Sequence, residues 1–434
     1  MPTTLSPLLL LFLLLVLSLA AENSTPITRF QSYLRIPTAH PTPNYTAAVT
    51  YLTTLAAAVP TLQSLTLHLS TLSKPILLLT LPGSNVSLPS LLLSSHLDSV
   101  PADPSHWSQP PFFATRDGDG RIYARGAQDD KCIGMQYLEA IGNLVKQGFR
   151  NVRTVRVLYV VDEEIGGRDG MGLFVESEVF RGLNVGFLLD EGQASETEEY
   201  RVFKGDRVPW NVVVKAEGRP GHGSTMYDGS ATERLMESVE VVMRFRESQF
   251  EEVKTGVRAG SEVVSVNAVY LKAGTPSPNG FLMNMQPSEA EAGFDVRMPP
   301  TADPDVMKKK IAEEWAPASR NMTYQIIEKG PIRDYLGQPL MTATDDTNPW
   351  WSLFSQAVTA AGGILAKPEI LPSTTDSRYI RHKGIPALGF SPMKNTPILL
   401  HDHNEFLQDT VYLEGIKVYE SIIRTLSSYE GLPS

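Results

Sequence analysis

Apolar and polar positions along the chain follow the period of a buried strand in some segments and that of an amphipathic helix in others. Continuous apolar runs bounded by turn residues predict strands over 90–95, 152–161 and 184–189. Residues 131–147 carry apolar side chains on one helical face, and Gly148 follows them as a stop signal. Strands that alternate with helices in this way are typical of an α/β fold with a central, mostly parallel sheet.

The pattern changes at about residue 205. Shorter alternating segments predict further strands over 212–216, 262–271, 291–298 and 323–327. Amphipathic segments predict helices over 230–247 and 303–316. Two strand–helix–strand blocks in so short a region indicate an α+β domain inserted at 205–325.

After this insertion the α/β pattern returns, with helices expected over 349–361 and 411–427 and a strand over 385–390. The catalytic α/β domain is therefore expected in two parts, 26–204 and 326–434.

The N-terminus begins with an apolar run at residues 8–19, followed by small residues that suit cleavage near Ala20. We predict a signal peptide over residues 1–20, because the run is short for a transmembrane span of about 20 residues. No Lys or Arg precedes the run, so an uncleaved signal anchor remains an alternative.

Four N-x-Ser/Thr sequons fit a glycoprotein of the secretory pathway, in the ER or Golgi lumen, the vacuole or the extracellular space. They begin at Asn23, Asn44, Asn85 and Asn321. If the leader is not used, the protein is expected in the cytoplasm. No other run is long and apolar enough to cross a bilayer, so no stable membrane span is expected after cleavage.

Composition narrows the classes of function. The 434 residues include 38 Lys and Arg against 48 Asp and Glu, a net charge of −10, which speaks against a nucleic-acid partner. A single cysteine excludes an intrachain disulfide framework and a cysteine-rich zinc site. The 42% of hydrophobic residues excludes a mainly disordered chain.

Three successive predicted strands end in ionisable residues: His96 and Asp98 after the first, Glu163 and Glu164 after the second, and Glu191 after the third. Ligands of open α/β sheets gather outside the carboxyl ends of strands, so these side chains are expected to meet. Histidine and carboxylate ligands without cysteine suit zinc, cobalt or manganese.

Two local spacings suggest different roles for neighbouring ionisable residues. His96 and Asp98 are two residues apart on an extended segment, so Asp98 can hold the imidazole of His96 as a supporting partner. Of the neighbours Glu163 and Glu164, one can ligate a metal while the other acts as the base that activates water.

Taken together, the segments H-L-D (96–98), R-G-A-Q-D (125–129), D-E-E-I-G-G (162–167), D-E-G (190–192) and L-L-H-D-H (399–403) resemble the M20 family of dinuclear-zinc metallopeptidases and amidohydrolases. This family contains aminoacylases, carboxypeptidases and dipeptidases. The resemblance runs from about residue 27 to residue 427 and is closest to the aminoacylase-1-like members. Their motifs look like Y-A-R-G-A-Q-D (123–129), Y-L-E-A (137–140), G-R-P-G-H (218–222), A-L-G-F-S-P-M (387–393) and L-L-H-D-H (399–403).

The resemblance implies two metal ions per subunit, with zinc as the family expectation and cobalt or manganese tolerated by the ligand types. The implied bridging carboxylate is Asp129, with His96 and Glu191 completing one site and Glu164 and His401 the other. Asp130 is the alternative bridge if this assignment is wrong by one position. His403 is the alternative to His401.

The same resemblance implies catalytic and substrate-binding roles. Glu163 would be the general base and proton shuttle, with Asp98 in its supporting role. His222, on an inserted ferredoxin-like lid and dimerisation domain, would reach the active site of a partner subunit and stabilise the oxyanion, which implies a homodimer. The implied substrate-binding residues are Asn284, Arg297 and Arg378. Four further histidines, His40, His68, His106 and His382, have no companion motif and are interpreted as ordinary surface or core residues.

The expected activity is therefore metal-dependent hydrolysis of the amide bond of small N-acyl-L-amino acids, which releases a carboxylate and a free amino acid. A carboxypeptidase, a dipeptidase or a hydrolase of amino-acid conjugates on the same scaffold is the alternative. A secreted binding protein that has lost catalysis is a remoter one. A serine hydrolase is disfavoured because the chain has no G-x-S-x-G.

Overall fold

The computed structural model describes residues 24–70 and 74–431, and the chain divides into two compact units. The first unit comprises residues up to Lys204 together with Thr342–Glu369 and the segment from Thr375. The second comprises Gly205–Met341 and Ile370–Thr374. The predicted leader and Asn23 lie outside the described residues. Within the described part of the chain, no helix has both the length and the apolar character needed to cross a membrane.

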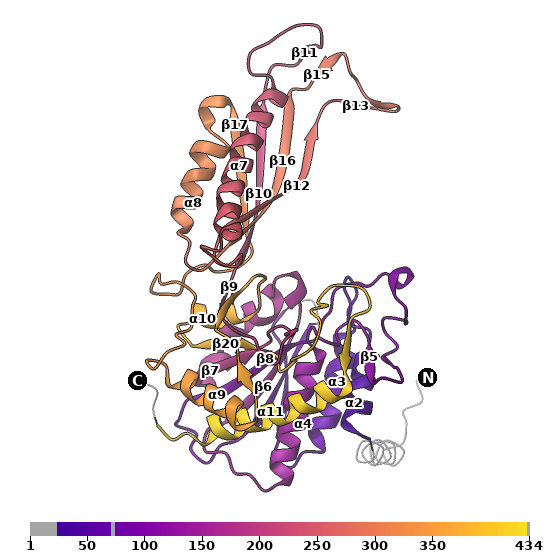
Figure 1. Ribbon diagram of the computed structural model, residues 1–434, viewed down its shortest axis with the longest axis vertical. Helices are drawn as coiled ribbons and strands as arrows, with labels where there is room; N and C mark the ends of the chain where they lie inside the picture. The colour runs from indigo at the N-terminus through magenta and orange to yellow at the C-terminus, as the bar shows by residue number, and fades with distance from the viewer. Residues whose placement is uncertain (1–23, 71–73, 432–434) are drawn as a thin grey trace, which may run out of the picture. The chain divides into compact units, whose positions relative to one another are not determined.

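The first unit is built on an eight-stranded sheet (Figure 1). In sheet order its strands are β1 (Gln63–His68), β2 (Pro75–Leu81), β6 (Val155–Val160), β3 (Ser90–His96), β7 (Val185–Asp190), β20 (Ala387–Phe390), β9 (Val202–Asp206) and β19 (Glu369–Leu371). The middle strands β6, β3, β7 and β20 are parallel, whereas β1, β2 and β9 pair in antiparallel fashion. The carboxyl ends of β6, β3 and β7 therefore lie side by side at one edge.

Helices cover this sheet because its central strands are apolar on both faces; every residue of β3 is buried. The helices are α2 (Pro26–Leu34), α3 (Tyr45–Ala57), α4 (Lys131–Lys146), α5 (Leu173–Glu176), α6 (Glu178–Gly182), α9 (Pro349–Ala360), α10 (Ser377–His382) and α11 (Asp409–Ser428). Helix α4 packs on β3 and on α11, which also contacts α9, and α3 packs on β1 and β2 (Figure 1).

Small sheets complete the first unit. They are formed by β4 (Thr115–Arg116), β5 (Arg121–Tyr123) and β21 (Phe406–Gln408), and by β8 (Glu199–Tyr200) with β18 (Ile364–Leu365). Pairing of β21 with β5 brings the segment after His401 alongside the segment that leads to Asp129.

The second unit is a four-stranded antiparallel sheet with two helices (Figure 1). Its elements are β10 (Val208–Glu217), α7 (Ala231–Lys254), β12 (Ser265–Ala273), β16 (Glu289–Met298), α8 (Pro304–Lys310) and β17 (Met322–Glu328), with the small pairs β11 (Gly221–His222) and β15 (Met285–Gln286), and β13 (Pro276–Ser277) and β14 (Gly280–Phe281). The β-α-β-β-α-β succession and the sheet order β12-β16-β10-β17 are those of a ferredoxin-like fold. Its own core contains Trp210, Phe294 and Trp315, all almost fully buried.

The predicted α/β fold with a separate antiparallel-sheet domain is confirmed. The second unit extends to Met341 rather than to residue 325, because β17 pairs with β10 along its length and residues 329–341 stay with this unit. The predicted strand over 152–161 begins only at Val155, since the N–H groups of Val152 and Arg153 both donate to the carbonyl of Ser427 instead of to a neighbouring strand.

Candidate metal centre

The strand-end residues meet as the sequence predicts, because β3 lies between β6 and β7 and is parallel to both. His96 is the last residue of β3. Glu163 and Glu164 form a short 3-10 turn just after β6, and Glu191 directly follows β7. The sheet therefore delivers one imidazole and three carboxylates to one edge.

Asp129 lies between two imidazoles. Its Oδ1 is 3.0 Å from Nε2 of His96, and its Oδ2 is 3.1 Å from Nε2 of His401. Glu164 Oε2 is 2.9 Å from the same nitrogen of His401, and Glu191 Oε1 is 3.7 Å from that of His96. One carboxylate thus presents a different oxygen to each of two histidine–glutamate pairs, which is the arrangement that a bridging ligand of two ions requires.

Candidate ligand atoms also gather around His96 in two groups, each within 4.8 Å. One group joins His96 to Glu163 and Glu191, and the other joins it to Asp129 and Glu164. Glu163, which is half-buried, therefore lies beside the first histidine–glutamate pair, where a base for an attacking water would be needed.

The electrostatics of the cluster favour cations. Burial, together with neighbouring carboxylates that include Glu164 and Asp129, raises the pKa of Glu163 and of Glu191 well above the usual range. Burial also acts to raise the pKa of Asp129, but hydrogen bonds to His401 and His96 outweigh it and leave that pKa below its usual value. Divalent cations would relieve this crowding of negative charge. The nitrogen and oxygen donors, without sulfur, fit zinc, cobalt or manganese.

Asp98 lies beside His96 and also contacts the loop that carries the two glutamates. Nδ1 of His96 is 3.0 Å from the backbone carbonyl of Asp98, whereas the carboxylate Oδ1 is 3.7 Å away. The buried carboxylate instead accepts hydrogen bonds from the backbone N–H groups of Glu163 (3.2 Å) and Glu164 (3.1 Å). Burial opposes its ionisation, but the hydrogen bond with His40 and the nearby imidazole of His96 lower the pKa of Asp98 to about 2.

Comparison with known proteins places these residues in a family. The profile of the peptidase family M20/M25/M40 matches residues 92–425. The chain belongs to this family.

Curated relatives of this M20 chain match over almost their whole length. Aminoacylase-1B of Rattus norvegicus is 41% identical, over 95% of this chain and 98% of the relative. Aminoacylase-1 of Homo sapiens is 40% identical over the same shares of both chains. Among solved structures, a dinuclear metal-binding M20 peptidase of Bacillus subtilis superposes with a TM-score of 0.63 at 15% identity, covering 93% of this chain and 98% of that one. The groups around Asp129 are accordingly the candidate ligands of an M20 dinuclear metal site.

The two alternative ligands have other partners. Oδ1 of Asp130 is 3.6 Å from Nε2 of His96, but Asp130 belongs to neither ligand group of the described residues. The carboxylate of Asp130 accepts hydrogen bonds from the backbone N–H of His96 (3.1 Å) and the hydroxyl of Ser95 (3.0 Å), so it holds the end of β3. The exposed His403 stacks on His106, with ring centroids 4.8 Å apart, and belongs to neither ligand group of the described residues. Geometry therefore favours Asp129 and His401.

In the second unit, His222 and Asn284 are neighbours. Both are exposed, His222 pairs with Met285, and the N–H of Gly223 donates to the carbonyl of Asn284. Arg297 lies on β16 of the four-stranded sheet, which runs for ten residues from Glu289 to Met298. It is near the end of that strand that is farther along the chain from Asn284. About 30 Å of strand separates the two ends of β16, so His222 and Arg297 of one copy do not meet within this unit.

The two arginines predicted to bind substrate already have partners. Nε and Nη2 of Arg297 donate to the two oxygens of Asp295, at 2.7 and 2.9 Å, which leaves the other N–H groups of its five-donor fork for a further acceptor. Arg378 is buried on α10, and its Nη2 donates to the carbonyl of Gly166 at 2.8 Å. In this structure Arg378 anchors the D-E-E-I-G-G loop.

Sequence reasoning missed several residues that hold the site. His40, interpreted as an ordinary histidine, places Nε2 2.9 Å from Oδ2 of Asp98. Tyr45 donates from its hydroxyl to Asp162 at 2.6 Å, just before the glutamate pair. These contacts join distant parts of the chain, and the sequence carried no spacing that would have indicated them.

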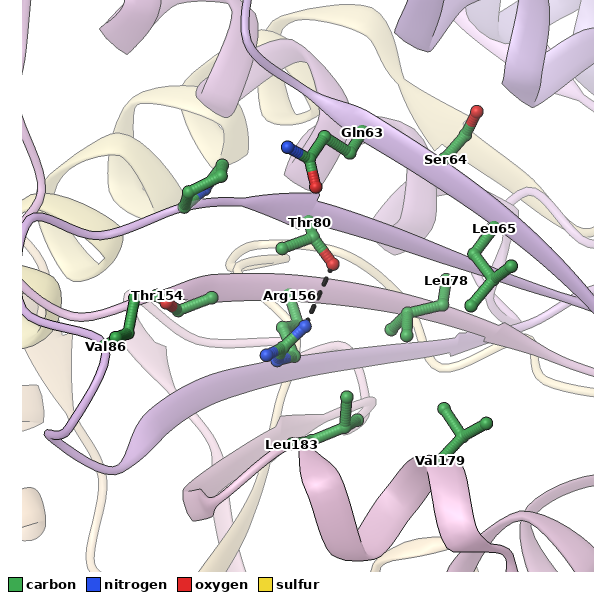
Figure 2. A pocket seen from close by; sticks show the side chains of 11 residues that line it. Gln63, Ser64, Leu65, Leu78, Thr80, Val86, Thr154, Arg156, Val179 and Leu183 are labelled. Carbon is green, nitrogen blue, oxygen red and sulfur yellow. Dashed lines mark hydrogen bonds between the residues drawn. The ribbon is translucent and has the colours of Figure 1, made fainter.

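The cavity in Figure 2 is separate from the metal centre. It measures about 520 Å³ and lies over β1, β2 and β6, where Arg156 Nη1 donates to the hydroxyl of Thr80 at 3.0 Å. None of the predicted site residues lines it.

Proposed function

We propose that this chain is an N-acyl-L-amino-acid amidohydrolase, which cleaves the amide bond of an N-acylated amino acid and releases a carboxylate and the free amino acid. Two observations support the proposal. The identity to aminoacylases of about 40% extends over 95% of the chain. The carboxylate of Asp129 lies between His96 and His401, with Glu163 beside them. The position of Asp129 between the two histidines is the observation that most directly supports a metal-dependent reaction.

The proposed cofactor is a pair of zinc ions per subunit, with cobalt or manganese as functional substitutes. Such ions polarise the scissile carbonyl and make an attacking water acidic at neutral pH. His96 and Glu191 would hold one ion, Glu164 and His401 the other, and Asp129 both.

Glu163 is the proposed general base. Its carboxylate takes a proton from the attacking water as the new carbon–oxygen bond forms, and then delivers that proton to the amide nitrogen as the carbon–nitrogen bond breaks. The water thus supplies both the oxygen of the product carboxylate and the proton of the free amine. Asp98 holds the backbone of Glu163 in place for both transfers.

The most direct test is a hydrolysis panel of N-acetyl amino acids, including methionine, aspartate and aromatic residues, against dipeptides. We expect hydrolysis of the N-acetyl substrates and loss of turnover in Glu163→Gln with both metal ions retained. Glu313→Gln, an exposed position, is the matched control. Preference for dipeptides would favour a peptidase, and near-normal activity of Glu163→Gln would reject the proposed base.

A homodimer is part of the proposal, because Arg297 pairs with Pro209 near the start of β10 whereas His222 lies on β11, beyond the end of β10 at Glu217. We propose that His222 reaches the active site of a partner subunit and stabilises the oxyanion there, and that Asn284 and Arg297 help to hold the substrate carboxylate. Mixing two inactive variants, Glu163→Gln and His222→Asn, should restore part of the activity. A mixture that stays inactive after subunit exchange has been verified would contradict shared sites.

For localisation we propose the secretory pathway, with a cleaved leader. Asn44, Asn85 and Asn321 are exposed, as glycan acceptors must be. Asn44 uses its side-chain oxygen to cap α3 by accepting the N–H of Ala47, which leaves its amide nitrogen for modification. Expression of the full chain in eukaryotic cells should give a product whose mass falls after N-glycosidase treatment. An unmodified product that retains residues 1–20 would contradict this route.

A further inference from the structure

A buried carboxylate that the proposed chemistry does not use holds the loop carrying Asp129. Glu405 has no exposed side-chain surface and accepts hydrogen bonds from the N–H groups of Gly126 (3.1 Å), Gln128 (2.7 Å) and Asp129 (3.3 Å). It also pairs with Nη1 of Arg125 at 2.7 Å. One side chain therefore accepts three backbone N–H groups of the segment that leads into the bridging carboxylate.

Gln128 makes the reciprocal connection. Its Nε2 donates to the carbonyls of Pro397 (3.0 Å) and Phe406 (2.8 Å), and its Oε1 accepts the N–H of Leu399 (3.1 Å). Pro397 and Leu399 precede His401 along the chain and Phe406 follows it, so the side chain of Gln128 is bonded to the chain on both sides of His401. Glu405 and Gln128, which we call the clamp, thus join the segment that carries Asp129 to the segment that carries His401.

The two halves of the metal centre differ in how firmly the rest of the fold supports them. His96 is the buried end of β3, with its side chain 1% exposed, and its Nδ1 is fixed by the carbonyl of Asp98. His401 lies on an irregular segment at a backbone φ of 62°, and 54% of its side chain is exposed. Only the first histidine is positioned by a central strand, so the second depends on contacts such as those of the clamp.

We propose that Glu405 and Gln128 are positioning residues that set the distance between Asp129 and His401, and thereby make the second cation site, which Glu164 completes, ready to bind. The proposal rests on the dinuclear metal centre described under Proposed function. It assigns the clamp a selective effect on one of the two ions. A purely structural role would instead lower the stability of the whole unit and affect both ions alike.

Two substitutions separate these outcomes. Glu405→Gln keeps the shape but removes the charge opposite Arg125 and turns one acceptor into a donor that faces backbone N–H groups. Because breaking a buried ion pair is strongly destabilising, Gln128→Met serves as the second variant. It removes three hydrogen bonds without changing any charge. Gln325→Met, at an exposed position whose side chain forms no hydrogen bond with the described residues, is its matched control.

The experiment titrates metal-free full-length protein with Zn²⁺ by calorimetry and repeats the titration with Co²⁺, whose absorption spectrum reports each site. We expect the wild type and the control to bind two ions. Gln128→Met and Glu405→Gln should keep the first affinity and lose about 10- to 100-fold in the second, the usual effect of removing a group that orients a metal ligand. Raising the metal concentration should then restore kcat with N-acetyl substrates.

Two results would overturn the proposal. One is wild-type affinity for both ions in Gln128→Met. The other is an equal loss at both sites accompanied by a lower unfolding temperature of the metal-free protein, which would indicate a structural role alone. Failure of the proposed function would give a distinct result: the wild-type protein would bind two ions but cleave no N-acyl amino acid. That result would leave the assignment of the clamp intact.

Discussion

Replacing Asp98 with asparagine tests whether its carboxylate positions the catalytic loop or the metal ligand. The carboxylate accepts the N–H groups of Glu163 and Glu164 on different oxygens, and it also contacts His40. An asparagine of the same shape can accept on only one side. Whichever way it turns, one buried backbone N–H of the loop then faces an NH₂ group.

An unsatisfied buried donor costs about 1–3 kcal/mol. If that cost falls on the arrangement of the loop that presents Glu163, a value of about 2 kcal/mol lowers kcat about thirty-fold. Metal content should remain at two ions, because Nδ1 of His96 is held by the backbone carbonyl of Asp98, which the substitution preserves. KM should change little, since no proposed substrate-binding residue is altered.

The assay is steady-state hydrolysis of an N-acetyl amino acid together with elemental analysis of the same preparations. Asp346→Asn, at an exposed position, is the matched control. Unchanged kcat would refute the role of the carboxylate in holding the loop. Loss of one metal ion together with activity would show that Asp98 acts on the His96 ligand instead, as its sequence spacing alone suggested.

Three further predictions follow from the same structure. Removing metal with a strong chelator should abolish hydrolysis and lower the unfolding temperature, because the carboxylates of Asp129, Glu164 and Glu191 then lie close together without cations. Readdition of Zn²⁺ should reverse both effects, and full activity in the chelated protein would refute metal dependence. The hydrogen bond to Asp98, with smaller contributions from Asp162 and Glu164, raises the pKa of His40 despite its partial burial. This contribution to stability is complete below the pKa of an unfolded histidine and is lost as pH rises through the raised value. The difference in unfolding temperature between wild type and His40→Gln should therefore shrink from pH 5.5 to pH 8.5, and a difference that stays constant would contradict the role of this hydrogen bond. Trp315→Ala should destabilise the second unit by about 3–5 kcal/mol, because its fully buried ring packs against Phe245 and Phe294; calorimetry that shows a loss below about 1 kcal/mol would contradict this packing.

Strongly periodic segments allowed accurate prediction of secondary structure. The helix expected over 131–147 is α4, Lys131–Lys146, and the strand expected over 90–95 is β3, Ser90–His96. The sequence predicted one helix over 303–316. In the structure the α-helix α8 ends at Lys310, and the wider turn of a π-helix follows directly from Ile311 to Trp315. Hydrophobic spacing does not distinguish these two kinds of turn over so few residues.

Other elements were not predicted from the sequence. Helix α3 contains several threonines, which are poor helix formers, and no helix was predicted there. Its stability comes from the Asn44 cap and from burial against β1 and β2. Strands β1 and β2 were not predicted either. Strand β1 is an edge strand with one buried residue. Strand β2 is a buried apolar run of the kind that indicated the other strands, so the hydrophobic pattern could have revealed it.

The sequence by itself determined which strand-end side chains this protein brings to its active site. A parallel sheet places the carboxyl ends of neighbouring strands at one edge, and the residues at those ends are His96, Glu163–Glu164 and Glu191. Only the tertiary structure decided which atoms face one another. It turned the carboxylate of Asp98 toward backbone N–H groups, and it set Glu405 and Gln128 between segments more than 250 residues apart. Hydrogen bonds of that kind depend on how distant segments pack, and no local pattern of residues specifies them.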